Sequence, residues 1–303
     1  MPLRAWSVVG VLCAAAVAAL FGAGAPRVGA QPGASADAVT RGRYIFGAAA
    51  GCGCHTEAKK GSPLNAGGRK YEGPFGTVYS TNITPDRETG IGTWTDDQII
   101  TATRLGRRPN GERLVPVHPY PVFNGMAEAD LRALVAYLRS VPPVNRRNTP
   151  RRLVPLFETV LLPAWLAAFA VRETPPATAP AAGVPRGEYL VRAVSHCGEC
   201  HTPRGVTQAV DNSRFLGGNQ THPEGKMPNI TPDKQTGIGE WSEEDIAEFI
   251  GTGNKPDGDV AGDLMAEVIQ GTSAGYKDLT KADRLAIAKY IKSIPAVQNK
   301  VGK

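Results

Sequence analysis

Two stretches of the chain carry apolar residues every three or four positions, the spacing that places side chains on one face of an α-helix. The first holds Leu131, Leu134, Val135 and Leu138, and the second holds Leu285, Ala288 and Ile291. Three places show the residue pattern of a helix N-terminus: Thr95-x-x-Gln98, Ser242-x-x-Asp245 and Thr280-x-x-Asp283. No run of alternating apolar and polar residues indicates a strand, so the sequence predicts a mainly α fold.

The first thirty residues follow a different pattern. Arg4 precedes an uncharged, mostly apolar run from Ala5 to Ala25, and the small-x-small sequence Val28-Gly29-Ala30 precedes Gln31. This order is typical of a cleaved export signal over residues 1–30. The run is also long enough to span a bilayer, so an uncleaved anchor is the alternative. Either interpretation predicts a periplasmic location, with attachment to the inner membrane under the second.

Several short motifs occur twice and in the same order. Arg41-Gly42-x-Tyr44 recurs 145 positions later as Arg186-Gly187-x-Tyr189. Asn82-Ile83-Thr84-Pro85-Asp86 and Thr89-Gly90-Ile91-Gly92-x-Trp94 both recur 147 positions later, from Asn229 and from Thr236. Tyr137 and Pro142 recur at a spacing of 153. Chance does not produce such a series, so the chain is interpreted as a tandem duplication.

The duplication predicts two small helical domains, over residues 31–148 and 186–303, joined by a linker over residues 149–185. Residues 174–185 of the linker are rich in Pro and Ala and are expected to be extended. Residues 159–171 are apolar and include Trp165 and Phe169, but thirteen residues are too few to span a membrane. We expect this segment to pack as a helix against one domain or to dock on a membrane or partner.

The net charge does not indicate a nucleic-acid partner. The formal charge of +6 falls to +4 without residues 1–30, which contain Arg4 and Arg27. The chain also has no concentrated Lys/Arg run interleaved with aromatic residues. Binding to nucleic acid is therefore not expected.

Four of the five cysteines form two close pairs, each followed directly by a histidine, while Cys13 lies within the export signal. Cys197-Gly198-Glu199-Cys200-His201 has the Cys-x-x-Cys-His pattern that attaches c-type haem. The two thiols form thioethers to the haem, and the histidine becomes the proximal ligand of its iron. A redox disulfide leaves the histidine unexplained, and a zinc site needs a second ligand pair that does not follow.

The first pair, in Cys52-Gly53-Cys54-His55, has one residue fewer between its cysteines. The flanking motifs keep their register on both sides, so both thiols and the histidine are retained. We therefore expect a second covalent haem c, attached through Cys54 with Cys52 contributing weakly or not at all.

A haem iron takes a sixth ligand or leaves that position open, and methionine gives the high-potential, electron-transferring choice. For the second haem we expect Met265, 64 residues after His201, with Met227 as the alternative. For the first haem Met126, 71 residues after His55, is favoured over His118, which would give bis-histidine ligation and a lower potential. His196 and His222 have no assigned role and are expected at the surface.

Together these motifs resemble dihaem relatives of the cytochrome c subunit of membrane-bound alcohol and related periplasmic dehydrogenases. The resemblance covers roughly residues 40–300 and includes the Ala129-Asp130-Leu131-Arg132-Ala133-Leu134 closing helix. It implies two tandem class I cytochrome c domains, with Met126 and Met265 as the distal ligands. It also implies electron transfer from a dehydrogenase towards quinone or a terminal oxidase. The chain departs from the better-known subunits in having two haem motifs instead of three.

The sequence thus favours an electron-transfer protein with no substrate chemistry of its own, because two methionine-capped irons leave no open coordination position. The alternative is a haem enzyme such as a dihaem peroxidase, which needs an iron that can open. Ligation by His118 would favour that alternative.

Overall fold

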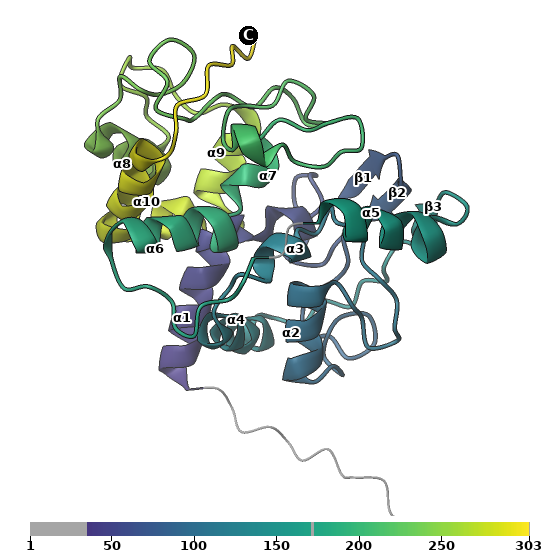
Figure 1. Ribbon diagram of the computed structural model, residues 1–303. Helices are drawn as coiled ribbons and strands as arrows, with labels where there is room; N and C mark the ends of the chain where they lie inside the picture. The colour runs from purple at the N-terminus through teal and green to yellow at the C-terminus, as the bar shows by residue number, and fades with distance from the viewer. Residues whose placement is uncertain (1–34, 171–172, 303) are drawn as a thin grey trace, which may run out of the picture. The chain divides into compact units, whose positions relative to one another are not determined.

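The computed structural model describes residues 35–170 and 173–302, so the expected export signal lies outside the described part. Residues Ser35–Lys303 form one compact, mostly helical unit (Figure 1), which confirms the prediction of a mainly α fold. The helices are α1 (Ala36–Ala48), α2 (Asp96–Leu105), α3 (Tyr120–Phe123), α4 (Glu128–Ser140), α5 (Leu162–Phe169), α6 (Gly183–Tyr189), α7 (Cys197–His201), α8 (Glu243–Thr252), α9 (Asp263–Gln270) and α10 (Lys281–Ser293). Within the described ranges, no helix is both long and apolar enough to cross a bilayer.

The predicted helix starts are confirmed. Thr95 and Ser242 cap α2 and α8 through reciprocal hydrogen bonds with Gln98 and Asp245, and Thr280 caps α10. Each of these caps satisfies backbone N–H groups that have no partner within the helix. The helices therefore begin where the side chains can accept those hydrogen bonds.

The repeated Arg-Gly-x-Tyr motif places a glycine where two helices cross. In the first copy α1 packs against α4, and in the second α6 packs against α10 (Figure 1). A Cβ on Gly42 would lie 1.9 Å from the carbonyl oxygen of Ala133, and one on Gly187 would lie 1.9 Å from that of Ala286. Only glycine allows the backbones to approach this closely, so the motif sets the distance between these helices.

A small sheet was not predicted. Strands β1 (Lys70–Gly73), β2 (Gly76–Tyr79) and β3 (Arg152–Leu153) form an antiparallel sheet in the order β1-β2-β3. The strands have two to four residues, too few to produce an alternating pattern in the sequence. β3 also comes from the expected linker, which therefore begins as part of this sheet.

The repeated Asn-Ile-Thr-Pro-Asp loops are fastened by the same bonds in both copies. Asn82 Nδ2 donates to Thr89 Oγ1 (3.0 Å) and to the carbonyl oxygen of Val144 (2.7 Å). Asn229 Nδ2 donates to Thr236 Oγ1 (3.0 Å) and to the carbonyl oxygen of Val297 (2.6 Å). Each buried asparagine thus ties its loop to the chain that follows the closing helix.

Candidate functional site

The two cysteine–histidine motifs lie in different kinds of turn. Cys52 to His55 belong to the 3₁₀ turn Ala50–His55 directly after α1, while Cys197–His201 forms the helix α7. The tighter turn accommodates the shorter motif, because a 3₁₀ turn needs fewer residues than an α-helical one. The side chain of Cys52 lies outside the described part of the structure. Cys54, Cys197 and Cys200 are free thiols.

Both motif histidines are held by equivalent backbone carbonyls. His55 Nδ1 donates to the carbonyl oxygen of Thr81 (2.7 Å), and His201 Nδ1 donates to that of Pro228 (2.8 Å). Thr81 and Pro228 directly precede the fastened Asn82 and Asn229. These bonds fix the tautomer of each ring, so Nε2 carries the free lone pair. A histidine prepared in this way can bind a metal through Nε2.

The charge states suit covalent haem rather than redox thiols. Burial lowers the pKa of His55 and of His201, so both rings are neutral at pH 7, as metal ligation requires. Burial raises the pKa of Cys197 to about 11 and of Cys200 to about 12. Such thiols are protonated at neutral pH and lack the thiolate that disulfide exchange needs. The residues present therefore fit a haem that is bonded to the thiols and ligated by the histidine.

The first motif lies against the second copy of the repeat. Thr272 Oγ1 donates to the carbonyl oxygen of Gly51 (2.6 Å), and a Cβ on Gly53 would lie 2.7 Å from Glu267 Oε1. Arg69, which is mostly buried, forms ion pairs with Glu267 and with Glu224 (3.1 Å). Glu267 belongs to α9, the helix that also carries Met265. Besides burial, Cys54 also contributes to the raised pKa of Cys200. The two motifs therefore lie near one another at this shared contact region, which suits electron exchange between two bound groups.

The four candidate distal ligands lie in different environments. Met126 is fully buried just before α4, whereas Met265 is half-buried on α9. Met227 is buried in a bridge with Asn219 and directly precedes Pro228, whose carbonyl holds His201. The ring centre of His118 lies 6.5 Å from that of His55. Burial, with a contribution from His55, lowers the pKa of His118 to about 3, so this imidazole is also neutral.

His196 is half-buried and not exposed, contrary to expectation. Its ring packs against Phe123 with centroids 5.3 Å apart, and Phe123 in turn packs against His118 at 5.4 Å. His222 is half-buried as well. The position of His196 was not foreseen, because its aromatic neighbour Phe123 comes from the other copy of the repeat.

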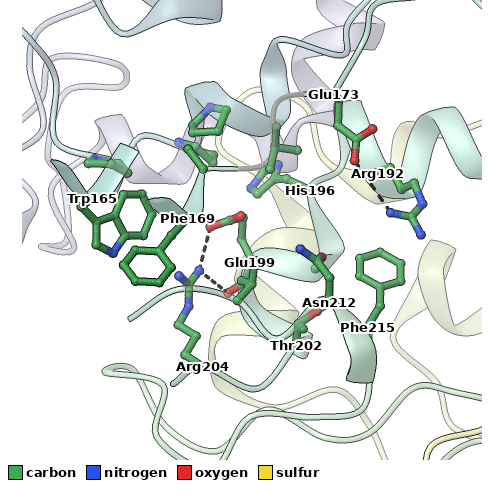
Figure 2. A pocket seen from close by; sticks show the side chains of 17 residues that line it. Trp165, Phe169, Glu173, Arg192, His196, Glu199, Thr202, Arg204, Asn212 and Phe215 are labelled. Carbon is green, nitrogen blue, oxygen red and sulfur yellow. Dashed lines mark hydrogen bonds and ion pairs between the residues drawn. The ribbon is translucent and has the colours of Figure 1, made fainter. Parts of the chain in front are cut away.

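The apolar part of the expected linker lies in the π-helical turn Phe157–Leu161 and in α5. Trp165 Nε1 donates to the carbonyl oxygen of Thr207 (2.7 Å), so α5 is fastened to the second copy. Trp165 and Phe169 line a pocket together with Glu199 and Arg204 (Figure 2). Arg204 donates to both the carboxylate (2.7 Å) and the carbonyl (3.0 Å) of Glu199, which lies inside the cysteine motif. The linker helix and that motif therefore line the same pocket.

No family model matches the chain, but curated proteins do. It is 37% identical over 267 residues to a diheme cytochrome c-type of Cereibacter sphaeroides, a match that covers 86% of each chain. This chain belongs to the family of c-type cytochromes. Membership implies covalently bound haem c and a role in electron transfer.

Larger proteins also resemble this cytochrome. It is 38% identical over 293 residues to the cytochrome c subunit of a quinone alcohol dehydrogenase from Gluconobacter oxydans. It is 37% identical over 269 residues to the cytochrome c subunit of gluconate 2-dehydrogenase from Pantoea cypripedii. These matches cover 93% and 85% of the cytochrome but only 60% of either relative. The cytochrome thus spans about three-fifths of those subunits.

Proposed function

We propose that this protein is a periplasmic dihaem cytochrome that passes single electrons from a dehydrogenase towards quinone or a terminal oxidase. It would consist of two class I cytochrome c domains, residues 31–148 and 186–303, joined by the linker 149–185. The observation that carries the proposal is the pair of histidines held at Nδ1 by Thr81 and Pro228. Two equivalent proximal ligands call for two haems.

The cytochrome's own residues have distinct tasks at each site. Cys54, with Cys52 as a weaker partner, and the pair Cys197 and Cys200 would hold the haems covalently. Bound haem c supplies a one-electron couple and no proton chemistry. The carbonyls of Thr81 and Pro228 hold Nδ1 of the two histidines, so that Nε2 would be free to bind the iron.

We assign Met265 rather than Met227 as the distal ligand of the second haem. Met227 directly precedes Pro228, and the Pro228 carbonyl holds the proximal His201. Met227 therefore belongs to the segment that supports the proximal side, whereas a distal ligand must reach the opposite face of the haem. Met265 comes from α9, a separate element that is half-buried beside the shared contact region.

The proposal is tested on the full chain, produced in a host that matures c-type cytochromes. We expect two haems per chain in the alkaline pyridine spectrum, and one in a Cys197→Ala/Cys200→Ala control. A quinone alcohol dehydrogenase or a gluconate dehydrogenase, supplied with its substrate, should reduce the cytochrome. Inner-membrane vesicles containing a terminal oxidase should then reoxidise it. Absence of a second haem, or no reduction by either dehydrogenase, would contradict the proposal.

A dihaem peroxidase is the second candidate, because the structure places a second imidazole beside His55. The centre of the His118 ring lies 6.5 Å from that of His55, and a bis-histidine haem has a lower potential than a His/Met one. A peroxidase also needs an iron whose sixth position can open. Hydrogen peroxide turnover separates the two functions.

A further inference from the structure

The backbones of the two copies keep a constant spacing of 147 residues beyond the ends of the capped helices α2 and α8. Gly106 ends α2 and Gly253 ends α8, both in the left-handed conformation and 147 positions apart. The hairpin-like segments that follow make equivalent backbone hydrogen bonds at this same spacing. They contain the isolated bridges Arg107–Arg113 and Asn254–Val260, and the hydrogen bonds from Leu114 N to Gly106 O (2.8 Å) and from Ala261 N to Gly253 O (2.7 Å).

Four residues past these bonds, the same spacing of 147 pairs His118 with Met265. The residue expected to ligate the second haem therefore has a histidine as its counterpart in the first copy. The sequence motifs alone did not reveal this pairing, because the spacing changes from 147 to 153 between Trp94 and Tyr137.

Met126 has a different counterpart. Before the closing helices the spacing has grown to 153, which pairs Met126 with Leu279. Both residues make the same bond three positions back, from Met126 N to Phe123 O (3.0 Å) and from Leu279 N to Tyr276 O (3.0 Å). Both are also buried, at 0% and 4% exposure. Because a leucine cannot ligate iron, this position is one of core packing in the second copy, and the matching bond and burial favour the same role for Met126.

The neighbours of Met126 support a packing role. The N–H of Ala127 donates to Tyr189 Oη (3.1 Å), and a Cβ on Gly125 would lie 3.1 Å from that of Ala193. Met126 thus sits in a segment that contacts the second copy on both sides. An apolar residue just before the N-cap commonly packs on the fourth helical residue, here the buried Leu131.

The position of His118 fits a ligand that faces His55. Two imidazoles bound on opposite sides of one metal, each through a bond of about 2 Å, have ring centres roughly 6–6.5 Å apart. The observed separation is 6.5 Å, and the interplanar angle of 79° is permitted because each ring can rotate about its bond to the metal. The bond from His118 Nε2 to the Thr103 carbonyl is 3.3 Å, longer than the usual range of about 2.7–3.2 Å. Little is therefore lost when the ring turns away from Thr103.

We infer that His118, and not Met126, is the distal ligand of the first haem, so that the two haems of this protein differ in ligation. The inference rests on the proposed function, since it requires a haem at the first motif. The first haem then has bis-histidine ligation and a lower potential than the second, which has His201 and Met265. At equilibrium a single electron therefore resides on the second haem, and electrons run downhill from the first motif to the second.

The test uses the full chain with both haems counted by the alkaline pyridine spectrum. The readouts are the near-infrared sulfur-to-iron band per haem, the low-temperature paramagnetic resonance spectrum and a redox titration. We expect one sulfur-to-iron band for two haems and two separate titration steps. Met126→Leu, which copies Leu279, should leave the band and both steps unchanged. His118→Met, which copies Met265, should add a second band and raise the lower step.

His118→Ala should convert one haem to a form that binds carbon monoxide or added imidazole, without losing covalent haem. Two bands in the unmodified protein, one of which disappears in Met126→Leu, would overturn the inference and leave the proposed function intact. A chain that carries haem only at Cys197–His201 would instead overturn the proposed function, and the inference with it. The haem count separates the two failures.

Discussion

Tyr44 donates a hydrogen bond to Asp283 Oδ2 at 2.5 Å, across 239 positions of the chain. The reciprocal hydrogen bond is also present, since Tyr189 of the second copy donates to Asp130 Oδ2 of the first at 2.8 Å. Each aspartate also accepts from the arginine of its own copy, Asp130 from Arg41 and Asp283 from Arg186. The Arg-Gly-x-Tyr motif therefore performs three tasks. Its arginine fastens a helix pair, its glycine lets that pair approach, and its tyrosine joins the two copies.

Replacing either tyrosine of this exchange should destabilise the protein without affecting haem attachment. Tyr44→Phe and Tyr189→Phe each leave a largely buried carboxylate with one hydrogen bond fewer, at a cost of about 1–3 kcal/mol in the free energy of unfolding. Denaturant unfolding followed by circular dichroism measures this loss. Tyr79→Phe, in the half-exposed strand β2, is the control and should change stability little. If all three variants lost the same free energy of unfolding, the two Tyr–Asp hydrogen bonds between the copies would contribute no specific stability.

Acid should weaken the same contact. Burial alone would raise the pKa of Asp283, but its hydrogen bonds from Arg186 and Tyr44 outweigh burial and hold that pKa below its usual value. A carboxylate with a lowered folded pKa stabilises the fold fully above its unfolded pKa of about 3.9, and that contribution disappears as the pH falls through the folded value. The free energy of unfolding should therefore drop below about pH 4. Asp283→Asn should be less stable at pH 7 and show a smaller drop. A variant with an unchanged pH profile would contradict the assignment.

Met265→Ala should remove the sulfur-to-iron band of the second haem and lower its potential, because the thioether is lost from the iron. Met227→Leu is the matched control, since leucine preserves its buried volume while removing sulfur. The near-infrared spectrum and a redox titration report both changes. Loss of the band in Met227→Leu, but not in Met265→Ala, would reverse the assignment.

Cys54 should matter more than Cys52 for covalent attachment at the first motif. The shortened motif keeps the Cys54-His55 arrangement of thiol and ligand intact, while the missing residue lies between the two cysteines. The α-band of the alkaline pyridine spectrum distinguishes one thioether from two. Cys52→Ala should retain covalent haem at this site and Cys54→Ala should lose it. The opposite outcome would make Cys52 the main attachment point.

Hydrogen peroxide should reoxidise the reduced protein only slowly. Ligation by His118 gives the first haem the low potential that favours a peroxidase, but a peroxidase also needs an iron that opens. In the proposed arrangement His118 and Met265 both stay on their irons, so neither leaves an open position for peroxide. Stopped-flow absorbance of the reduced haems measures the rate. Turnover at ordinary enzyme rates, about ten per second or more, would favour the peroxidase instead.

Residues close together in the chain determine where three helices begin and which chemistry the cysteine–histidine motifs carry. The caps at Thr95, Ser242 and Thr280 predicted three helix starts, because a side chain that accepts from the nearby backbone acts within four residues. The cysteine–histidine motifs predicted the haem chemistry for the same reason, since both thiols and the ligand are neighbours in the chain.

The tertiary structure decided what depends on register and on distant contacts. The three short strands left no pattern to detect, and the carbonyls of Thr81 and Pro228 are chemically like any other until folding brings them to His55 and His201. The sequence also shows two spacings between equivalent residues of the two copies, 147 and 153, but it does not show where the first gives way to the second. Backbone hydrogen bonds place that change after Leu114 and before Phe123. The spacing of 147, extended four residues past Leu114, pairs His118 with Met265, and the spacing of 153 pairs Met126 with Leu279. Residue identity alone does not show which spacing applies, because only the hydrogen-bonded backbone marks the equivalent positions of the two copies.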